Sequence, residues 1–345
     1  MASISLQNIS IVFGTKTDRA LDLADQGFSR TEIQEETGHI LGVHNCSLDI
    51  REGELLVLMG LSGSGKSTLL RAINRLTPIS RGCVTVYHDN QAFNVTDAAT
   101  KELRYLRTHL ISMVFQQFGL LPWRTVADNV GFGLEIAGLK KQERAEAVAH
   151  QLELVGLQDW ATRKVGELSG GMQQRVGLAR AFATGAPILL MDEPFSALDP
   201  LIRARLQDEL LHLQDHLKKT IVFVSHDLDE AMKLGNRIAI MEGGRIIQCG
   251  NGQDILSKPA NDYVADFVAN MNPLSVLLAA DIMSALDRSA PPRPFAATAK
   301  PDTPIQDIMQ AIVRNNGDVG VVHNGAIVGK ISADDVVRSL TRHQK

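Results

Sequence analysis

Short apolar runs alternate with longer amphipathic segments over the first 250 residues of the chain. Leu55–Met59, Ile188–Met191 and Ile221–Val224 are continuous apolar runs with the length of buried strands. Helices are expected between such runs, for example over Lys66–Leu76 and Met172–Thr184. Because strands that alternate with helices usually pair in parallel, this pattern predicts an α/β domain built on a parallel sheet.

A polar segment interrupts this pattern near the N-terminus, over Thr15–Gly42. Within it, Ser29 and Glu32 have the spacing of a capping box and predict a helix over Arg30–Thr37, with Gly38 as its C-terminal stop. We therefore expect a helical insert between two strands. The flanking strands are expected at Ser3–Phe13 and Val43–Ile50.

The composition changes after Asn270, where Asn272-Pro273 and Pro291-Pro292-Arg293-Pro294 indicate a linker. Beyond the linker, Thr303–Lys345 follows the order helix, strand, turn, strand, helix, and Asn324-Gly325 is a strong signal for a two-residue hairpin. We expect three parts in the chain. They are a large α/β domain over 1–270, a linker over 271–302 and a small α+β unit over 303–345.

Composition narrows the classes of partner. The formal net charge of -4 offers no attraction for nucleic acid, so no nucleic-acid partner is expected. No apolar run approaches the roughly 18 residues that a membrane-spanning helix needs, and the N-terminus shows no secretory signal. Cys46, Cys83 and Cys249 lie far apart without CxxC spacing, which argues against a zinc site or a disulfide. We therefore expect a cytosolic chain that reaches a membrane only through a partner.

A glycine-rich segment follows the predicted strand Leu55–Met59. It fits the phosphate-binding pattern GxxxxGK[ST] without a mismatch, and it opens a predicted helix as that pattern requires. Glycines let backbone N–H groups point at phosphate oxygens, Lys66 adds positive charge, and Ser67 offers a hydroxyl to Mg²⁺. A chance glycine-rich turn would produce this pattern in roughly one chain in a hundred. The predicted nucleotide-binding residues are Gly60, Leu61, Ser62, Gly63, Ser64, Gly65, Lys66, Ser67 and Thr68.

Two acidic residues end the predicted strand Ile188–Met191. Asp192 is placed to help hold Mg²⁺, and Glu193 to orient and polarise an attacking water. Solvated charges are the common alternative at a strand end, but the upstream phosphate loop favours a catalytic role. His226 follows another predicted strand and could reach a γ-phosphate at the same edge of the sheet, although a lone histidine there is usually structural or solvated.

The segment Leu168-Ser169-Gly170-Gly171-Met172-Gln173-Gln174-Arg175 resembles the LSGGQ signature of ABC ATPases, with Met172 in place of the usual glutamine. The resemblance extends over residues 1 to about 270 and implies an ABC-type P-loop domain with a helical subdomain at about 117–185. In this family two chains clamp two ATP molecules head to tail. The resemblance thus implies a homodimer in which Ser169, Gly170, Gly171, Met172 and Asp199 of the D-loop contact the ATP of the partner subunit.

Further motifs of the same family occur in the right order. Gln116 matches the Q-loop glutamine that touches Mg²⁺, His226 matches the switch histidine, and Phe13 lies where the family stacks an aromatic ring on adenine. The resemblance implies ATP and Mg²⁺ as cofactors. The implied catalytic residues are Glu193, His226 and Gln116, and the implied Mg²⁺ ligands are Ser67, Gln116 and Asp192.

The chain also resembles one importer subfamily. The insert at 15–42 is similar to that of the glycine betaine/proline group of quaternary-amine importers, and Gly119–Val126 with Asn261–Val264 is most similar to its choline branch. This resemblance implies a membrane permease and an extracytoplasmic substrate-binding protein as partners, with the chain at the cytoplasmic face of the inner membrane. Phe118 or Trp123 would suit an anchor for a coupling helix of the permease.

The tail, Thr303–Arg342, resembles a single CBS-type unit whose last helix starts at Ser332-Ala333-Asp334-Asp335, where relatives often carry a pair. It could pair across the dimer or be vestigial. Alternatives to this importer are another importer, an exporter subunit, a soluble ABC ATPase and a regulatory module. The sequence lacks the coiled-coil insertion or second ATPase module of soluble ABC proteins. The residues alone identify neither the transported molecule, nor the partner proteins, nor any ligand of the tail.

Overall fold

The computed structural model describes residues 2–116, 119–269, 277–285 and 295–342. Contacts within the chain divide it into two compact units. The first consists of Met1–His226 with Asn236–Cys249, and the second of Asp227–Gly235 with Gly250–Lys345. The predicted linker motifs at 272–273 and 291–294 lie outside the described residues.

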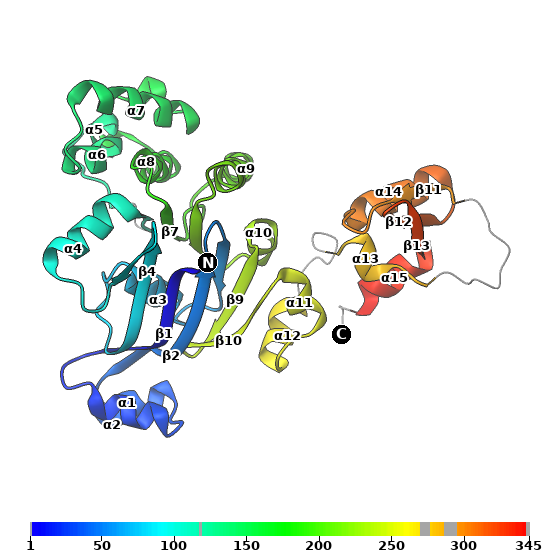
Figure 1. Ribbon diagram of the computed structural model, residues 1–345, viewed down its shortest axis with the longest axis horizontal. Helices are drawn as coiled ribbons and strands as arrows, with labels where there is room; N and C mark the ends of the chain where they lie inside the picture. Colours follow the sequence, from blue (N-terminus) through cyan, green and yellow to red (C-terminus); the bar gives the residue numbers. More distant parts are fainter. Residues whose placement is uncertain (1, 117–118, 270–276, 286–294, 343–345) are drawn as a thin grey trace. The chain divides into compact units, whose positions relative to one another are not determined.

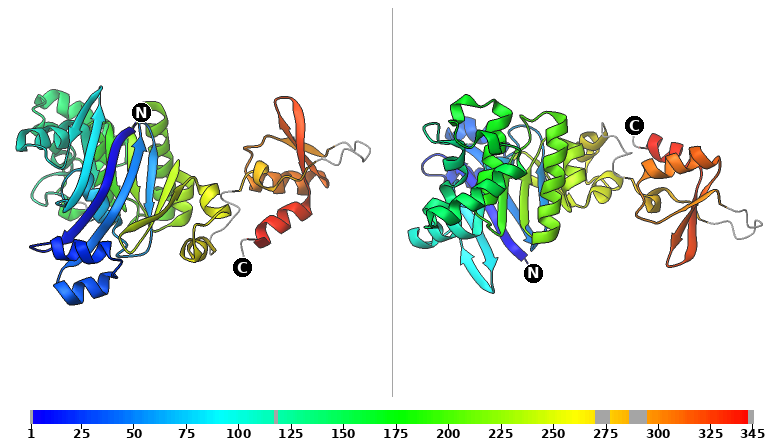
Figure 2. Two further views of the ribbon diagram at one scale, coloured as in Figure 1. Left: turned by 60° about the horizontal axis from the view of Figure 1, so that its bottom comes forward. Right: turned by 90° about the horizontal axis from the view of Figure 1, so that it is seen from above.

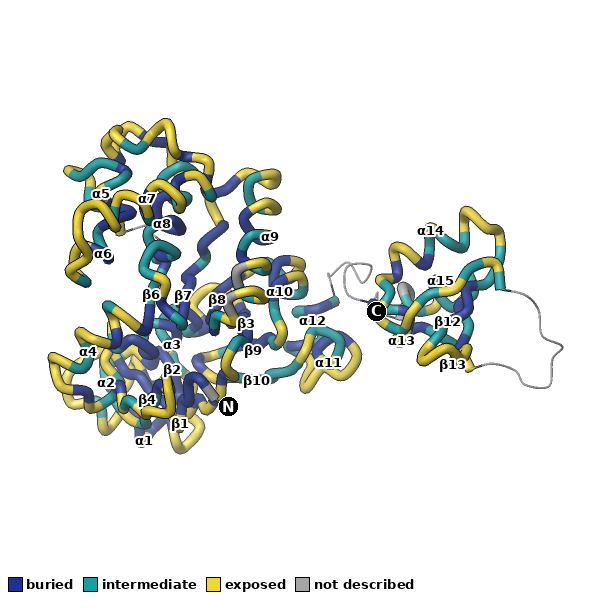
Figure 3. Tube along the Cα trace, turned by 45° about the horizontal axis from the view of Figure 1, so that its top comes forward, coloured by how far each residue is buried: buried dark blue, intermediate teal, exposed yellow. Residues whose placement is uncertain are grey.

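A six-stranded sheet in the order β10-β9-β3-β8-β7-β6 forms the centre of the first unit (Figure 1). Its strands are β3 (Leu55–Met59), β6 (Ile111–Val114), β7 (Ile188–Asp192), β8 (Thr220–Val224), β9 (Arg237–Glu242) and β10 (Arg245–Gly250). All residues of β3, β7 and β8 are buried, because these strands are covered on both faces (Figure 3). β3 pairs in parallel with β8 and β9, which confirms the predicted parallel sheet.

A second, antiparallel sheet in the order β2-β1-β4-β5 packs against the first unit's core. Its strands are β1 (Ala2–Phe13), β2 (Ile40–Arg51), β4 (Arg81–His88) and β5 (Gln91–Asn94). Helix α3 (Lys66–Ile73) contacts β1 and β2 of this sheet as well as β7 and β8 of the other. Its buried Leu69, Leu70 and Ile73 belong to one hydrophobic core that both sheets share. The N-terminus of α3 is therefore held firmly between the two sheets.

Helix α3 is shorter than the predicted Lys66–Leu76. Asn74 is its C-terminal cap, and the N–H groups of Leu76 and Thr77 both donate to the carbonyl oxygen of Arg71. This closing turn depends on backbone conformation, because Arg75 adopts a φ of 56°. The apolar pattern alone did not reveal the earlier end.

A group of helices occupies the part of the first unit where the sequence predicts a helical subdomain. Helices α5, α6 and α7 all contact α8, whose N-terminus carries the signature segment. The elements of this region and its flanks are α4 (Thr100–Tyr105), η1 (Leu106–Leu110), α5 (Val126–Val130), α6 (Phe132–Ile136), α7 (Lys141–Leu154), η2 (Gln158–Trp160), η3 (Val165–Glu167), α8 (Gly170–Ala183) and α9 (Pro200–Leu217).

The polar insert folds into two short helices, α1 (Asp18–Asp25) and α2 (Arg30–Thr37), which lie together beyond the ends of β1 and β2 (Figures 1 and 2). The capping box predicted for α2 is confirmed, since Ser29 and Glu32 bond each other's backbone N–H and Gly38 ends the helix at a φ of 70°. The insert has a small core of its own. It consists of Val12, Ala20, Leu21, Leu23, Ala24, Ile33 and Leu41.

The second unit contains a three-stranded sheet in the order β11-β12-β13. The predicted hairpin at Asn324-Gly325 is confirmed, with φ values of 51° and 79° that suit a type I′ turn. The elements of this unit are α10 (Leu228–Leu234), α11 (Gly252–Ser257), α12 (Asp262–Ala269), α13 (Ala279–Ile282), β11 (Ala297–Ala299), α14 (Ile305–Asn315), β12 (Val319–His323), β13 (Ala326–Ile331) and α15 (Ala333–Arg342).

Two short elements of this unit, α13 and β11, lie inside the segment that the sequence predicts as a linker. Leu278 forms a β-bridge with Pro304 and Ser284 one with Lys330, so this segment packs onto the small sheet. Because these pairings join residues distant in sequence, local composition did not indicate them. In the described ranges, no helix has the length and apolar character needed to cross a bilayer.

Candidate functional site

The glycine-rich loop joins β3 to α3 as predicted, and two of its glycines are required by both space and dihedral angle. Gly60 has a φ of 144°, and a Cβ there would lie 2.2 Å from the carbonyl oxygen of Met241. Gly65 caps α3 at a φ of 102°, and a Cβ there would lie 2.6 Å from the carbonyl oxygen of Gly42. A side chain at either position would displace the backbone that forms the loop.

Lys66, the first residue of α3, is 6% exposed. Its Nζ donates to the carbonyl oxygens of Gly60, at 2.8 Å, and Leu61, at 2.9 Å. Burial lowers the pKa of this ammonium, and the charges of Glu193 and Asp192 oppose that shift. The lysine is therefore held at the loop, where its positive charge attracts a bound anion.

Asp192 ends β7 and is fully buried. Its Oδ1 accepts from the hydroxyl of Ser67 at 2.7 Å, and its Oδ2 accepts from Nη2 of Arg71 at 2.9 Å. The structure thus brings together Ser67 and Asp192, two of the three residues predicted to hold Mg²⁺. The sequence analysis missed Arg71, although its position four residues after Ser67 on the same helix indicates a shared face.

Glu193 follows β7 in a left-handed backbone conformation with a φ of 50°. Its N–H donates to the carbonyl oxygen of Val224 at 3.2 Å, which holds this conformation at the strand end. Such conformations cost energy and gather at functional sites. Nε2 of Gln116 donates to Oε2 of Glu193 at 3.2 Å, and Nδ1 of His226 lies 3.5 Å from the same oxygen. The three predicted catalytic side chains therefore meet at one carboxylate.

These residues open onto a pocket of about 490 Å³. Its lining consists of Phe13, Arg30, Ile40, Leu41, Gly42, Ser62, Gly63, Gly65, Lys66, Ser67, Thr68, Gln116, Glu193 and His226. Most predicted residues of the nucleotide site thus share one pocket, whereas Gly60, Leu61, Ser64 and Asp192 do not line it. The sequence analysis missed Arg30, Ile40, Leu41 and Gly42. The sequence signal near these residues was the capping box that begins at Ser29, which predicted the helix that starts at Arg30.

The signature and D-loop residues lie at helix N-termini and do not line this pocket. Ser169 caps α8 by accepting from the N–H of Met172, and Asp199 caps α9. Gln174 of α8, which the sequence analysis also missed, is 1% exposed. Its Nε2 donates to the carbonyl oxygen of Glu193 at 3.4 Å, and its Oε1 accepts from the N–H of Ala197 at 3.2 Å. The signature helix is therefore tied to the backbone of Glu193 and to that of Ala197.

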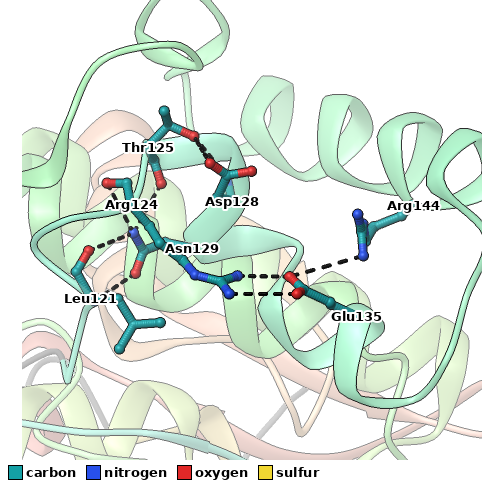
Figure 4. A network of polar contacts seen from close by, with 7 residues as sticks. All are labelled: Leu121, Arg124, Thr125, Asp128, Asn129, Glu135 and Arg144. Atoms are coloured by element: carbon teal, nitrogen blue, oxygen red, sulfur yellow. Dashed lines mark hydrogen bonds and ion pairs between the residues drawn. The ribbon is translucent and has the colours of Figure 1, made fainter.

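A polar network holds the loop between Leu121 and Asn129 (Figure 4). This loop carries Trp123, whose exposed fraction is 70%. Asn129 is fully buried, and its Oδ1 accepts from the N–H of Leu121 at 2.7 Å. Its Nδ2 donates to the carbonyl oxygens of Leu121, at 3.1 Å, and Thr125, at 2.9 Å. Trp123 is thus an exposed aromatic side chain on a fixed loop. The other predicted anchor, Phe118, lies outside the described residues.

Comparisons with known proteins agree with this geometry. The family model for ABC transporters matches residues 43–196. The chain is 44% identical over 345 residues to the glycine betaine/proline betaine transport system ATP-binding protein ProV of Escherichia coli, an alignment that covers 99% of this chain and 83% of ProV. It is 43% identical to the glycine betaine/carnitine transport ATP-binding protein GbuA of Listeria monocytogenes, with 97% and 84% covered.

A third relative has nearly the same length. The trimethylamine N-oxide transport system ATP-binding protein TmoW of Ruegeria pomeroyi is 42% identical, with 98% of this chain and 97% of TmoW covered. Among solved structures, the dimeric post-hydrolysis state of the ATP-binding cassette MJ0796 bound to ADP and Pi has a TM-score of 0.62 at 32% identity. That match covers 72% of this chain and 98% of the cassette. The chain therefore belongs to the ABC transporter family and is an ATPase of that family, in the branch that contains the ATP-binding proteins of glycine betaine and proline betaine transport systems.

Proposed function

We propose that two copies of this chain hydrolyse ATP to drive the import of a quaternary ammonium compound, glycine betaine or choline, through a membrane permease. The observation that carries this proposal is the convergence of Lys66, Glu193 and His226 on one pocket in a chain that resembles ProV and GbuA over nearly its whole length. The subunit would act at the cytoplasmic face of the inner membrane, and an extracytoplasmic binding protein would deliver the substrate.

ATP is proposed to bind in the pocket above α3. Lys66 and the free N–H groups at the start of α3 balance the phosphate charge, while the exposed ring of Phe13 stacks on adenine. The hydroxyl of Ser67 and the carboxylate of Asp192, 2.7 Å apart, fit Mg²⁺ because they are hard oxygen donors, and the amide oxygen of Gln116 adds a third. Mg²⁺ bound there supplies charge neutralisation to the phosphates.

The catalytic roles follow from the contacts at Glu193. Its carboxylate orients the attacking water, because Glu193 directly follows β7, lines the pocket and accepts a hydrogen bond from Gln116. His226, with 63% of its side chain exposed, lies beside that carboxylate and can approach a γ-phosphate in the pocket. Phosphoryl transfer requires such positioning more than covalent chemistry.

The second ATP contact is proposed to come from the partner subunit. Ser169, Gly170, Gly171 and Met172 start α8, a helix of 14 residues, and its N-terminal N–H groups and dipole suit an anion. Because these residues and Asp199 do not line the pocket of their own chain, they are available to a nucleotide held by another copy. The dimeric state of the MJ0796 cassette supports this arrangement.

The permease is proposed to dock at the loop around Trp123. An exposed tryptophan on a loop fixed by a buried asparagine suits the role of an interface anchor, since little entropy is lost when it is buried. The small unit over 303–345 is proposed to be a single CBS-type unit, on the strength of its helix, hairpin and helix order.

The central test is Glu193→Gln. This variant should bind ATP with the affinity of the wild type, lose turnover and accumulate as an ATP-dependent dimer, measured by nucleotide binding, phosphate release and light scattering. Lys66→Ala is the matched control, because it should lose binding as well as turnover. A Glu193→Gln protein that hydrolyses ATP normally, or that stays monomeric with ATP, would contradict the proposed clamp.

The substrate is tested by uptake of radiolabelled glycine betaine and choline into cells that carry the wild-type chain or Lys66→Ala with the same permease. Uptake of either compound that depends on Lys66 supports the proposal. The length match with TmoW makes trimethylamine N-oxide the informative third substrate. If only trimethylamine N-oxide shows Lys66-dependent uptake, that compound is the cargo and the proposed quaternary ammonium substrate is wrong.

A further inference from the structure

The side chain of Arg30 connects the helical insert to the phosphate loop. This residue is the first of α2, directly after the capping box. Its Nη1 donates to the carbonyl oxygen of Gly63 at 2.5 Å, and its Nη2 donates to the carbonyl oxygen of Gly42 in β2. One guanidinium therefore bridges the insert, the β2 strand and the loop predicted to bind phosphates.

The guanidinium lies in a close-fitting backbone socket. A Cβ at Gly244 would lie 2.5 Å from Nη2 of Arg30, and one at Gly65 would lie 3.4 Å from the same atom. Nε of Arg30 is buried and meets no acceptor among the described residues. Because the planar fork has two carbonyl partners and glycines on its flanks, a lysine could not reproduce both contacts.

The insert is anchored to the rest of the first unit on either side of Arg30. Ile33, one turn further along α2, is fully buried in the core of the insert. At the end of α1, Asp25 accepts two hydrogen bonds from Arg81 of β4, both at 2.7 Å, and one contact of 2.9 Å from His44 of β2. The backbone that carries Arg30 is thus fixed to the antiparallel sheet on its other side.

Four carbonyl oxygens of the phosphate loop accept hydrogen bonds from donors elsewhere in the protein. Nζ of Lys66 donates to the carbonyl oxygens of Gly60 and Leu61. The N–H of Gly244 donates to the carbonyl oxygen of Ser64 at 3.0 Å, and Arg30 donates to that of Gly63. A loop carbonyl that turned toward a phosphate would repel it, whereas N–H groups attract it. Holding the Gly63 peptide in one orientation therefore favours the anion-binding form of the loop.

We propose that Arg30 is a positioning residue for ATP binding, which couples the insert to the phosphate loop by fixing the Gly63 carbonyl. The inference rests on the proposed nucleotide site. It predicts that Arg30 acts on the affinity for ATP and leaves the chemical step at Glu193 alone, because its hydrogen bonds fix the loop before the nucleotide arrives.

The test measures the Kd for MgATP, the KM and the kcat of the full chain in four variants. Arg30→Ala should raise Kd and KM about tenfold, the loss expected for one charge-assisted hydrogen bond, while kcat stays within twofold of the wild type. Arg30→Lys keeps the charge and one contact, so it should recover part of the affinity. Arg19→Ala is the matched control, because Arg19 pairs with Glu36 on the exposed surface of the same insert. It should leave Kd within twofold.

The outcomes separate three explanations. A normal Kd in Arg30→Ala together with lost binding in Lys66→Ala would overturn the inference and leave the nucleotide site in place. Normal binding in Lys66→Ala would instead overturn the proposed site. If Arg30→Ala fails to fold, Arg30→Lys decides, since a Kd raised two- to fivefold supports the inference and a wild-type Kd refutes it. A fall in kcat with unchanged KM would also refute it.

Discussion

Asn129→Ala tests whether the loop that presents Trp123 depends on one buried amide. The wild-type side chain is fully buried and makes four hydrogen bonds to the backbone of Leu121, Thr125 and Arg124, at 2.7 and 3.1 Å, 2.9 Å and 3.5 Å respectively (Figure 4). Alanine removes all four and leaves the N–H of Leu121 and three carbonyl oxygens without these partners. The substitution does not lower the helix propensity of α5, because alanine is a good helix former.

The magnitude follows from these bonds. Each contributes about 0.5–1.5 kcal/mol net, so their loss should lower the free energy of unfolding by about 2–4 kcal/mol. Asp128→Ala is the matched control on the same helix. Its carboxylate accepts only from the hydroxyl of Thr125 at an exposed position, at 2.7 Å, so its loss should cost about 0.5 kcal/mol.

Two measurements are needed, because part of the loss is local. Urea unfolding followed by circular dichroism gives the free energy of unfolding. The anisotropy of Trp123 fluorescence, read in a Trp160→Phe background since the chain has two tryptophans, gives the mobility of the loop. Asn129→Ala should lower the free energy of unfolding and the anisotropy of Trp123. ATP affinity should stay normal, because Asn129 does not line the pocket. An unfolding free energy within 0.5 kcal/mol of the wild type, with unchanged anisotropy, would refute the reasoning.

Three further predictions concern the rest of the chain. Arg81 holds the pKa of Asp25 well below its usual range, so the stabilisation from this carboxylate is present at pH 7 and is lost as the pH falls below about 4. Unfolding curves of Asp25→Asn and the wild type should differ by up to about 1 kcal/mol at pH 7 and converge in acid, and a gap that persists there would contradict this. Burial raises the pKa of the Cys46 thiol to about 11, so mass spectrometry after iodoacetamide treatment at pH 8 should find Cys83 labelled and Cys46 intact until denaturant is added. Removing residues 277–345 should leave basal ATP hydrolysis unchanged in a phosphate-release assay, because the pocket lies wholly within the first 226 residues, and a loss of activity would show that the tail supports the site.

Local patterns were sufficient for much of the architecture and of the site. The continuous apolar runs at β3, β7 and β8 predicted buried parallel strands, because only strands covered on both faces are apolar throughout. The phosphate loop and the capping box of α2 were predictable for a similar reason. Their hydrogen bonds join residues only a few positions apart, so spacing in sequence encodes them.

Contacts between distant residues could not be predicted in this way. Bridges between Leu278 and Pro304 and between Ser284 and Lys330 hold the segment around α13, and β11 joins the small sheet by pairing in parallel with β12. Gln174 joins the signature helix to Glu193, a residue on another element, and nothing in its own segment distinguishes it from Gln173. Gln174 differs from Gln173 in being fully buried, and burial is a property of the folded chain.

The sequence by itself determined the local motifs of this protein, because each is specified by short-range spacing. They are a phosphate loop, two carboxylates at the end of a strand, a signature helix and a small unit with a hairpin. Only the tertiary structure decided which side chains share the pocket. Arg30 and Gly63 are far apart along the chain, yet one hydrogen bond joins them because α2 packs over the end of β2. The physical reason is that packing of the insert core, rather than any local pattern, brings that guanidinium to the loop.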